Sequence, residues 1–167
     1  MLIDPLAFIA EWHRSITHSL VMLPLWTILL GFGLAWLLGA QRQRTGIMLI
    51  CSLSIFSHTL TDLITSWGTQ IFAPITDYAP AWNLVFIIDP YFTGIIALAL
   101  LVALLKRSRL IARSGIVLLA LYVGMQGVLK HQAHDIGRGY ATQQDWQKVE
   151  IHTLPQPLAP FHWMIVI

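Results

Sequence analysis

Side chains that can bind a metal ion occur at intervals along a chain that is otherwise largely apolar. They are His13, His18, His58, Asp62 and Asp89, with Arg14 beside the first of them. Imidazoles and carboxylates without thiolates suit zinc, or manganese, iron or nickel, in a site with positions left open for water. Such a metal activates water near neutral pH for attack on an electrophile. The residue types therefore predict a hydrolytic metal centre, with zinc as the most favoured metal.

The spacing of two of these residues places them together. His58 and Asp62 are four positions apart, so a helix carries both side chains on one face, about one turn from each other. An ionisable group inside an apolar helix costs about 2.5–3.5 kcal/mol on membrane-insertion scales, so its presence requires an explanation. A bound metal provides one, because it offsets the burial of Asp62 and Asp89. The pairing therefore favours metal ligands over isolated packing residues.

The two N-terminal histidines require a break in the helix that would contain them. His13 and His18 are five positions apart, and a continuous helix would direct them about 140° away from each other. We expect Ser15 or Thr17 to cap the start of the following helix. His13 would then lie on an irregular lead-in that can fold back over the mouth of the site.

Each candidate residue has an expected role. The predicted ligands are His18, His58, Asp62 and Asp89. His13 is either a further ligand or the acid that protonates the leaving group, and Arg14 is expected to hold an anionic group such as a phosphate. Asp89 has a simpler alternative, because an aspartate before Pro90 can be a helix cap followed by proline at the first helical position.

Composition indicates that these residues lie in a membrane protein. The 167 residues are 56% hydrophobic and 11% charged, whereas soluble domains carry about 25% charged residues. A helix needs about 20 residues to cross the hydrocarbon core, and four segments meet or approach this length. They run from Ser19 to Gly39, from Gly46 to about Thr65, from about Leu84 to Leu105, and from Leu110 to Leu129. The predicted fold is all-α, a polytopic membrane protein with four transmembrane helices.

The positions of Lys and Arg predict how these helices are oriented. The basic residues follow the first helix, at Arg42 and Arg44, and the third, at Lys106, Arg107, Arg109 and Arg113. The loop between the second and third helices has no Lys or Arg. Because cytoplasmic loops are enriched in these residues, both basic loops are expected in the cytoplasm. The candidate ligands then share the opposite level, which predicts a multi-pass protein of a bacterial inner membrane whose site faces the periplasm.

The C-terminal part differs from the rest of the chain. Residues 1–130 form the expected transmembrane domain with the metal site, whereas residues 131–167 form an extracytoplasmic tail that ends in the strand-like FHWMIVI. An isolated strand is unstable, so this tail either docks on the helices or begins a truncated β domain. His131, His134 and Asp135 form a second cluster of potential ligands, although a polar helix end suffices to explain them.

Three short motifs resemble those of one known family. HRSITHS, HTLTDLITSWG and DPYFT match the patterns H-R-x-x-T-H-S, H-x-x-x-D-x-x-T-x-x-G and D-P-x-x-T of the membrane-bound metal-dependent hydrolases, the YdjM-like inner-membrane proteins. Besides the six candidate residues, the match includes Thr17, Ser19, Thr65, Gly68, Pro90 and Thr93. The resemblance implies a multi-pass helical enzyme whose divalent-metal site is made from these histidines and aspartates.

The predicted function is hydrolysis of an ester or phosphoester, including a lipid-linked one, because the site opens at headgroup depth. Membrane lipid is the expected partner, and a net charge of +2 gives no basis for binding nucleic acid. The main alternative is an ion or metal transporter, since intramembrane His and Asp often mark ion routes. The third is a noncatalytic scaffold with a structural metal site. The sequence indicates no oligomeric state.

Overall fold

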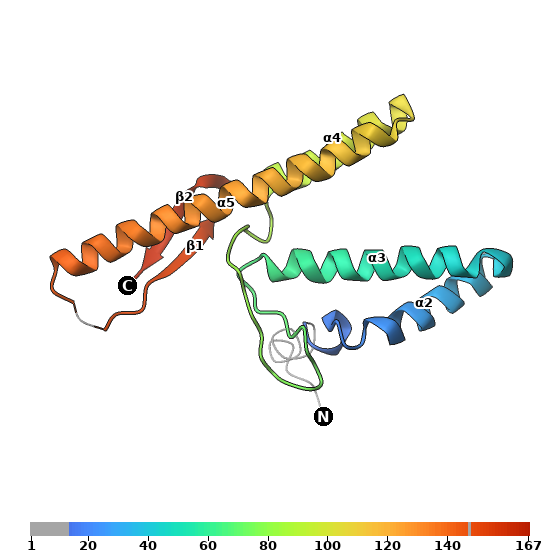
Figure 1. Cartoon of the computed structure of the whole chain (residues 1–167), viewed down its shortest axis with the longest axis horizontal. Coiled ribbons are helices and arrows are strands. Elements are labelled where there is room, and N and C mark those ends of the chain that lie inside the picture. Colours follow the sequence, from blue (N-terminus) through green and yellow to red (C-terminus); the bar gives the residue numbers. More distant parts are fainter. Residues whose placement is uncertain (1–13, 147) are drawn as a thin grey trace. The chain divides into compact units, whose positions relative to one another are not determined.

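The computed structural model describes residues 14–146 and 148–167. Within this part of the chain there are four α-helices, two short 3-10 helices and one two-stranded sheet (Figure 1). They form two compact units, and the boundary between the units lies between Trp82 and Asn83. The boundary separates two groups of residues that pack mainly among themselves. The expected division at residue 130 instead separates the apolar part of the chain from its polar tail.

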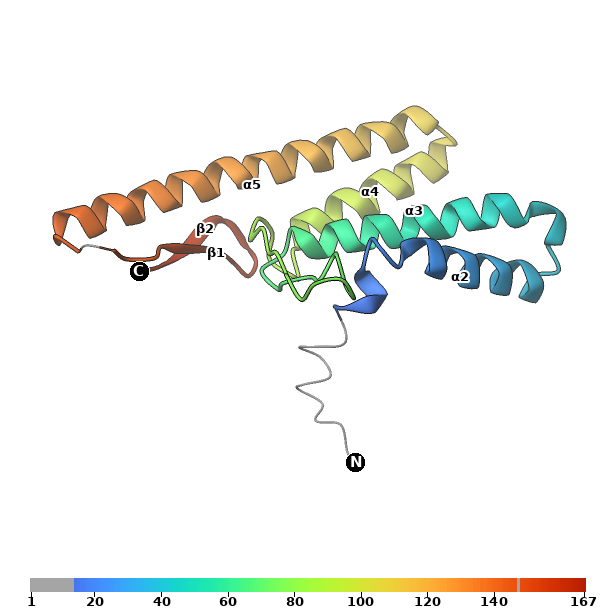
Figure 2. The ribbon, with the colours of Figure 1, turned by 60° about the horizontal axis from the view of Figure 1, so that its bottom comes forward.

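The first unit contains two antiparallel helices that pack against each other. The 3-10 helix η2 (Ile16–His18) precedes α2 (Leu23–Leu37), and the 3-10 helix η3 (Gln41–Gln43) connects α2 to α3 (Arg44–Leu63). A side chain at Gly31 would collide with Met48, so this glycine permits the close approach of α2 to α3. Figure 2 shows the pair with the connecting turn at one end. The chain that follows α3 is irregular as far as Trp82.

The second unit begins with another antiparallel pair, α4 (Pro90–Lys106) and α5 (Arg109–Gln143). Asp89 caps α4 by accepting hydrogen bonds from the backbone amides of Tyr91 and Phe92, at 2.8 and 2.9 Å. Pro90 occupies the first helical position, where the missing amide proton costs nothing. The two helices approach closely where Gly115 faces Ala99.

A β-hairpin completes the second unit. Strands β1 (His152–Gln156) and β2 (Ala159–Val166) pair in antiparallel register, with Thr153 opposite Ile165. The hairpin packs against α5 at Gly137, where an added Cβ would lie 2.8 Å from the Ile165 side chain and 2.9 Å from that of Ile151. Figures 1 and 2 both show the hairpin beside α5. The tail therefore docks on a helix, as one of the two expectations proposed.

The four expected helices are present, but the bounds of three of them differ from the prediction. The first begins at Leu23 rather than Ser19, and the third begins at Pro90 rather than near Leu84. The fourth continues to Gln143, well beyond Leu129. Hydropathy alone does not separate an apolar loop from an apolar helix, nor does it detect a polar helical extension.

The all-α assignment is wrong in one respect, because the described residues include the two-stranded sheet. The strand expected in FHWMIVI is correct, but its partner, β1, was not predicted. A strand needs a partner for its backbone hydrogen-bonding groups. The partner of β2 is β1, and a two-residue turn at Pro157 and Leu158 connects them.

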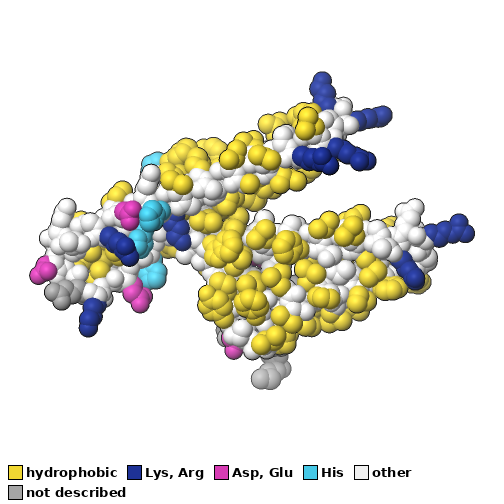
Figure 3. Space-filling model, viewed as in Figure 1, with side chains coloured by type: hydrophobic (Ala, Val, Ile, Leu, Met, Phe, Trp, Pro, Cys, Tyr) yellow, Lys and Arg dark blue, Asp and Glu magenta, His cyan; other side chains and the backbone are white. Residues whose placement is uncertain are grey.

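Two of the described helical segments are long and apolar enough to cross a membrane. They are Gln41–Leu63, with 23 residues, and Arg109–Gln143, with 35 residues. The helices Leu23–Leu37 and Pro90–Lys106 are apolar but shorter. Large apolar side chains cover the outside of the helices (Figure 3), including Trp36 at 73% exposure and Leu104 at 74%. Such extensive apolar exposure is the pattern of a surface in contact with lipid or another protein.

We predict that Gly137→Val weakens the docking of the hairpin on α5. The new side chain would overlap Ile165 and Ile151, and overpacking of this kind costs about 1–3 kcal/mol. Limited proteolysis of the purified full chain between α5 and β1 should accelerate about tenfold. Gly139→Val is the matched control, because a Cβ at Gly139 meets no atom within 4 Å. Equal cleavage rates in the two variants would contradict the docking.

Candidate metal centre

Three potential ligand atoms from η2 and α3 converge in the first unit. His18 Nε2 lies 3.2 Å from Asp62 Oδ2 and 3.1 Å from His58 Nε2. His58 Nε2 lies 3.9 Å from the same Asp62 oxygen. Across residues 14–146 and 148–167, this is the one group of three or more His, Cys, Asp or Glu side chains close enough to share a metal ion. The expected face formed by His58 and Asp62 is present, and His18 joins it from a distant part of the sequence.

These separations fit a small divalent metal ion. Zinc binds histidine nitrogen and carboxylate oxygen at about 2.0–2.2 Å, and tetrahedral geometry then separates the ligand atoms by about 3.4 Å. The observed separations of 3.1, 3.2 and 3.9 Å bracket this value. Three protein ligands with a further position open is the arrangement of catalytic zinc sites, whereas structural sites have four protein ligands.

The site is closed on one side and open on the other. The side chains of His18 and Asp62 are 8% and 14% exposed, whereas that of His58 is 65% exposed. A small molecule can therefore approach along the His58 side. The carboxylate of Asp62, by contrast, is largely removed from solvent and requires compensating partners.

Arg14 provides one of these partners. Its Nη2 lies 3.4 Å from Asp62 Oδ1, while Nη1 donates to Thr65 Oγ1 at 3.2 Å and to the carbonyl of Trp67 at 2.9 Å. The Thr65 hydroxyl also donates to the backbone carbonyl of Asp62 at 2.7 Å. Arg14 thus engages one oxygen of Asp62 while the other faces the histidines. Its expected role in holding an anionic substrate group stays a prediction.

Thr17 contacts the other nitrogen of the His18 ring. Thr17 Oγ1 lies 2.8 Å from His18 Nδ1. In the tautomer that carries its proton on Nδ1, this nitrogen donates to Thr17 and the lone pair of Nε2 faces Asp62. A hydrogen bond at the second ring nitrogen is the usual way in which proteins orient a metal-binding histidine.

The expectation that Ser15 or Thr17 caps the first helix is wrong. Neither η2 nor α2 has a side-chain cap, and the residue before α2 is Met22. A break is present before His18 as expected, because Ser15 is not helical, and a second break follows His18 at the extended Ser19. The 3-10 turn ends at His18, which places its ring beside α3 without directing it along α2.

The irregular segment after α3 holds the His18 region in place. Ser19 is fully buried, and its hydroxyl lies within hydrogen-bond distance of the carbonyls of Ile71 (3.3 Å) and Ala73 (2.5 Å). The backbone amide of Leu20 donates to Ile71, and that of Gln70 donates to the carbonyl of Arg14. These bonds connect the chain on both sides of His18 to the loop that follows α3.

Gly68 allows this loop to fold back on itself. A Cβ at Gly68 would lie 2.7 Å from the carbonyl oxygen of Ala79. Any residue other than glycine would therefore require the backbone at Ala79 to move. The amide of Thr69 donates to Pro80, and the amide of Trp82 donates to Leu63 at the end of α3. The glycine is therefore needed for the loop that supports the site.

Of the remaining predicted residues, Asp89 is not part of this group, and His13 lies outside the described residues. Asp89 belongs to the second unit, where one oxygen caps α4 and the other accepts a 2.6 Å hydrogen bond from the hydroxyl of Tyr122. The helix-cap interpretation of Asp89 is thus confirmed, and its role as a metal ligand stays a prediction. His131 pairs with Asp135 at 3.6 Å on the exposed surface of α5.

Tyr122 was not among the predicted site residues. It is buried on α5, and Gln126, four positions later, is also buried. Two polar residues at this spacing within an apolar segment are the pattern that marks a polar contact on one helix face. The sequence contained this signal, but it did not indicate that the partner would be Asp89.

We predict that Ser19→Ala destabilises the first unit. The substitution removes the hydroxyl that lies near the carbonyls of Ile71 and Ala73. Ile71 keeps the amide of Leu20, but the carbonyl of the buried Ala73 loses this donor, which costs about 1–3 kcal/mol. The thermal unfolding midpoint of the purified protein in detergent should fall by several degrees. Ser57→Ala is the control, because the exposed Ser57 hydroxyl bonds only within its own helix, to Ser54, among the described contacts. Equal midpoints for the two variants would show that the Ser19 bridge is not important.

Comparison with known proteins agrees with the helical membrane character of the chain. No curated protein and no solved structure matched it. A family model described as YdjM inner membrane protein matches residues 1–133. The matched segment contains His18, His58 and Asp62, as well as Asp89. Since the match covers well over half of the 167 residues, the chain belongs to the YdjM inner membrane protein family.

Proposed function

We propose that this protein is a metal-dependent hydrolase of the inner membrane that cleaves an ester or a phosphoester, including a lipid-linked one. The observation that carries the proposal is the convergence of His18 Nε2, His58 Nε2 and Asp62 Oδ2, with all three atoms within 4.8 Å of one another. The donor set favours zinc, and manganese, iron or nickel would also accept it. Membership in the YdjM inner membrane protein family supports the location.

The residues of this site have different roles in the proposed reaction. His18, His58 and Asp62 would hold the metal, and the metal supplies Lewis acidity and activates water near neutral pH. Arg14 pairs with Oδ1 of Asp62, while Oδ2 of the same carboxylate faces the histidines. The exposed side of His58 provides the route by which a substrate reaches the site.

Two further residues are assigned roles as part of this proposal. His13 is a further ligand or the acid that protonates the leaving group. Asp89, which the sequence predicts as an additional ligand, accepts hydrogen bonds on both of its oxygens, and carboxylates that bind metals are themselves hydrogen-bonded.

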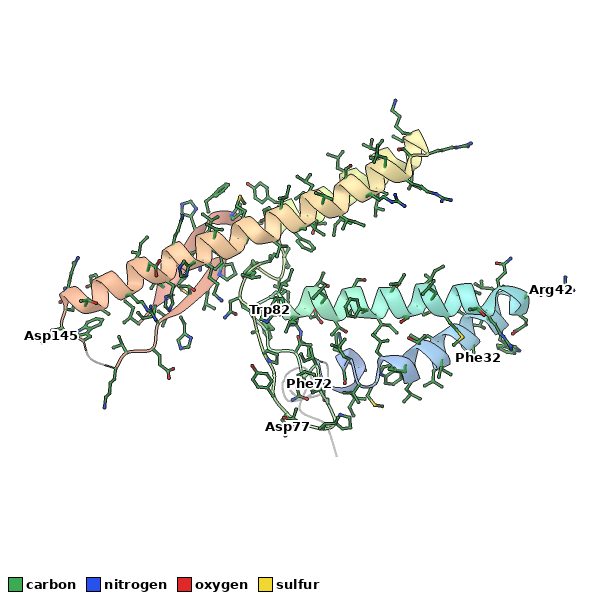
Figure 4. All side chains as sticks on the ribbon, viewed as in Figure 1. Phe32, Arg42, Phe72, Asp77, Trp82 and Asp145 are labelled. Atoms are coloured by element: carbon green, nitrogen blue, oxygen red, sulfur yellow. The ribbon has the colours of Figure 1, made fainter. Side chains whose placement is uncertain are left out.

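A periplasmic location for the site is supported by the ends of α3. Arg42 lies in the turn before α3, and Trp82 lies beside the opposite end of that helix (Figure 4). His58 and Asp62 are in the last two turns of α3, next to the tryptophan end. Basic residues favour the cytoplasmic side and tryptophan favours the interface, so the site end is assigned to the periplasm.

The first experiment measures metal content. The purified full chain should contain about one divalent transition metal per chain by elemental analysis, and His58→Ala should lose most of it. Because His58 is exposed, this substitution leaves no buried cavity. His131→Ala is the matched control, since His131 also pairs with an aspartate four residues later. Equal metal content in the wild type and both variants would overturn the metal site.

The second experiment measures catalysis. Purified protein should hydrolyse members of a panel of phosphoesters and acyl esters, lose activity on treatment with chelator and regain it with zinc. Asp62→Asn should lower kcat/KM by at least about 100-fold, because the amide replaces a charged ligand. Asp135→Asn should leave activity unchanged.

The same preparation separates the alternative functions. Metal binding without hydrolysis of any panel member, combined with Asp62-dependent metal flux into vesicles, would replace the hydrolase with a transporter. Metal binding with neither hydrolysis nor flux would indicate a scaffold.

A further inference from the structure

A long apolar groove runs along the α4–α5 hairpin. Its volume is about 1000 Å³, and its walls belong entirely to the second unit. Apolar side chains dominate the lining, among them Ile95 and Leu98 from α4 and Val117 and Leu121 from α5. Arg113 is the one charged residue in the lining, and it lies in the second turn of α5. The groove is therefore apolar along its length and positively charged near one end.

Positive charge is concentrated at that end of the hairpin. Lys106, Arg107, Arg109 and Arg113 occur within eight residues of sequence, and Figure 3 shows Lys and Arg gathered around the turn. The sequence contains no Asp or Glu between Asp89 and Asp135. In the described part of the chain, none of these four basic residues forms an ion pair. The charge is available to an anion outside the chain.

The length of the groove is close to the hydrocarbon thickness of one membrane leaflet. The lining residues on α4 extend from Pro90 to Val102, which corresponds to about 18 Å of helix. The hydrocarbon core of a bilayer is about 30 Å thick, so each leaflet contributes about 15 Å. One acyl chain that starts at the level of Arg113 would therefore follow the groove through a single leaflet.

We propose that the α4–α5 hairpin binds a membrane phospholipid with an anionic headgroup. One acyl chain occupies the groove, and the phosphate group contacts Arg113. The site involves only the second unit, so it does not depend on the metal centre or on hydrolysis. The lipid is a bound component of the protein rather than its substrate.

Charge favours a lipid over a second copy of the chain in this groove. Two copies in one membrane have the same orientation, so packing α4–α5 against α4–α5 would place both basic turns at the same level. Four positive charges on each copy would then repel each other across the interface. An anionic phospholipid brings the opposite charge to the same level and an apolar chain to the groove.

The test compares two lipids on the purified full chain. Native mass spectrometry is performed after incubation in mixed micelles that contain equal amounts of dioleoyl phosphatidylglycerol and dioleoyl phosphatidylcholine. The wild type should retain phosphatidylglycerol about tenfold more than phosphatidylcholine. Equal retention of the two lipids would overturn the proposal.

Two pairs of variants locate the bound lipid. Gly94 lines the groove, and a Cβ there meets no atom within 4 Å, so Gly94→Leu adds an apolar side chain to the groove at a position where the Cβ has room. Gly124 is equally open but does not line the groove, so Gly124→Leu is its control. Arg113→Gln removes the charged residue that lines the groove. Arg109→Gln is its control, because it removes a charge from the same basic end of the hairpin at a residue that does not line the groove.

Gly94→Leu and Arg113→Gln should each reduce retention of phosphatidylglycerol about five- to tenfold, and both controls should change it less than twofold. If Arg109→Gln reduces retention as much as Arg113→Gln, the preference is a general surface attraction and the groove site is wrong. If Gly94→Leu instead converts a dimer into a monomer, the groove is a subunit interface and the proposal is likewise overturned.

Discussion

The structure of the first unit depends on how it accommodates the carboxylate of Asp62. This group is only 14% exposed, and an isolated buried carboxylate would be costly enough to force its neutralisation. The fold supplies a guanidinium on one oxygen and two imidazoles near the other. Arg14 and His18 come from a segment about 45 residues before Asp62, so the N-terminal lead-in must return to the end of α3. Two hydrogen bonds to the loop after α3 hold this segment in place. The Ser19 hydroxyl donates to the carbonyl of Ala73, and the Gln70 amide donates to the carbonyl of Arg14.

The second unit stabilises a carboxylate by different means. Asp89 receives two backbone amides at the start of α4 and one phenol from α5, and these contacts include no basic side chain. The amides belong to a helix N-terminus, where the helix dipole favours negative charge. The hydrogen bond from Tyr122 ties the start of α4 to the middle of α5. One aspartate thus organises the packing of a helix pair, while the other belongs to a group with the geometry of a metal site.

Sequence patterns predicted the features that depend on local spacing. The pairing of His58 with Asp62 and the existence of four helices follow from helical periodicity and from long apolar runs. The start of α4 was misplaced because Leu84 to Ile88 are as apolar as the helix itself, and only the cap and proline distinguish the boundary. The contact of Arg14 with Asp62, the pairing of β1 with β2 and the partner of Tyr122 involve residues far apart in sequence. Spacing holds no information on such contacts, because the fold creates them.

The unbroken length of α5 has a mechanical consequence. A helix of 35 residues is about 52 Å long, whereas the hydrocarbon core is about 30 Å thick. An α5 that crosses the bilayer from its basic turn therefore continues about 20 Å past the far boundary as a regular helix. Because the β-hairpin packs on this part of α5 at Gly137, the length of the helix, rather than a flexible linker, then sets the distance between the hairpin and the lipid surface. Adding or deleting four residues in α5 would raise or lower the hairpin by about 6 Å and rotate it by about 40° about the helix axis.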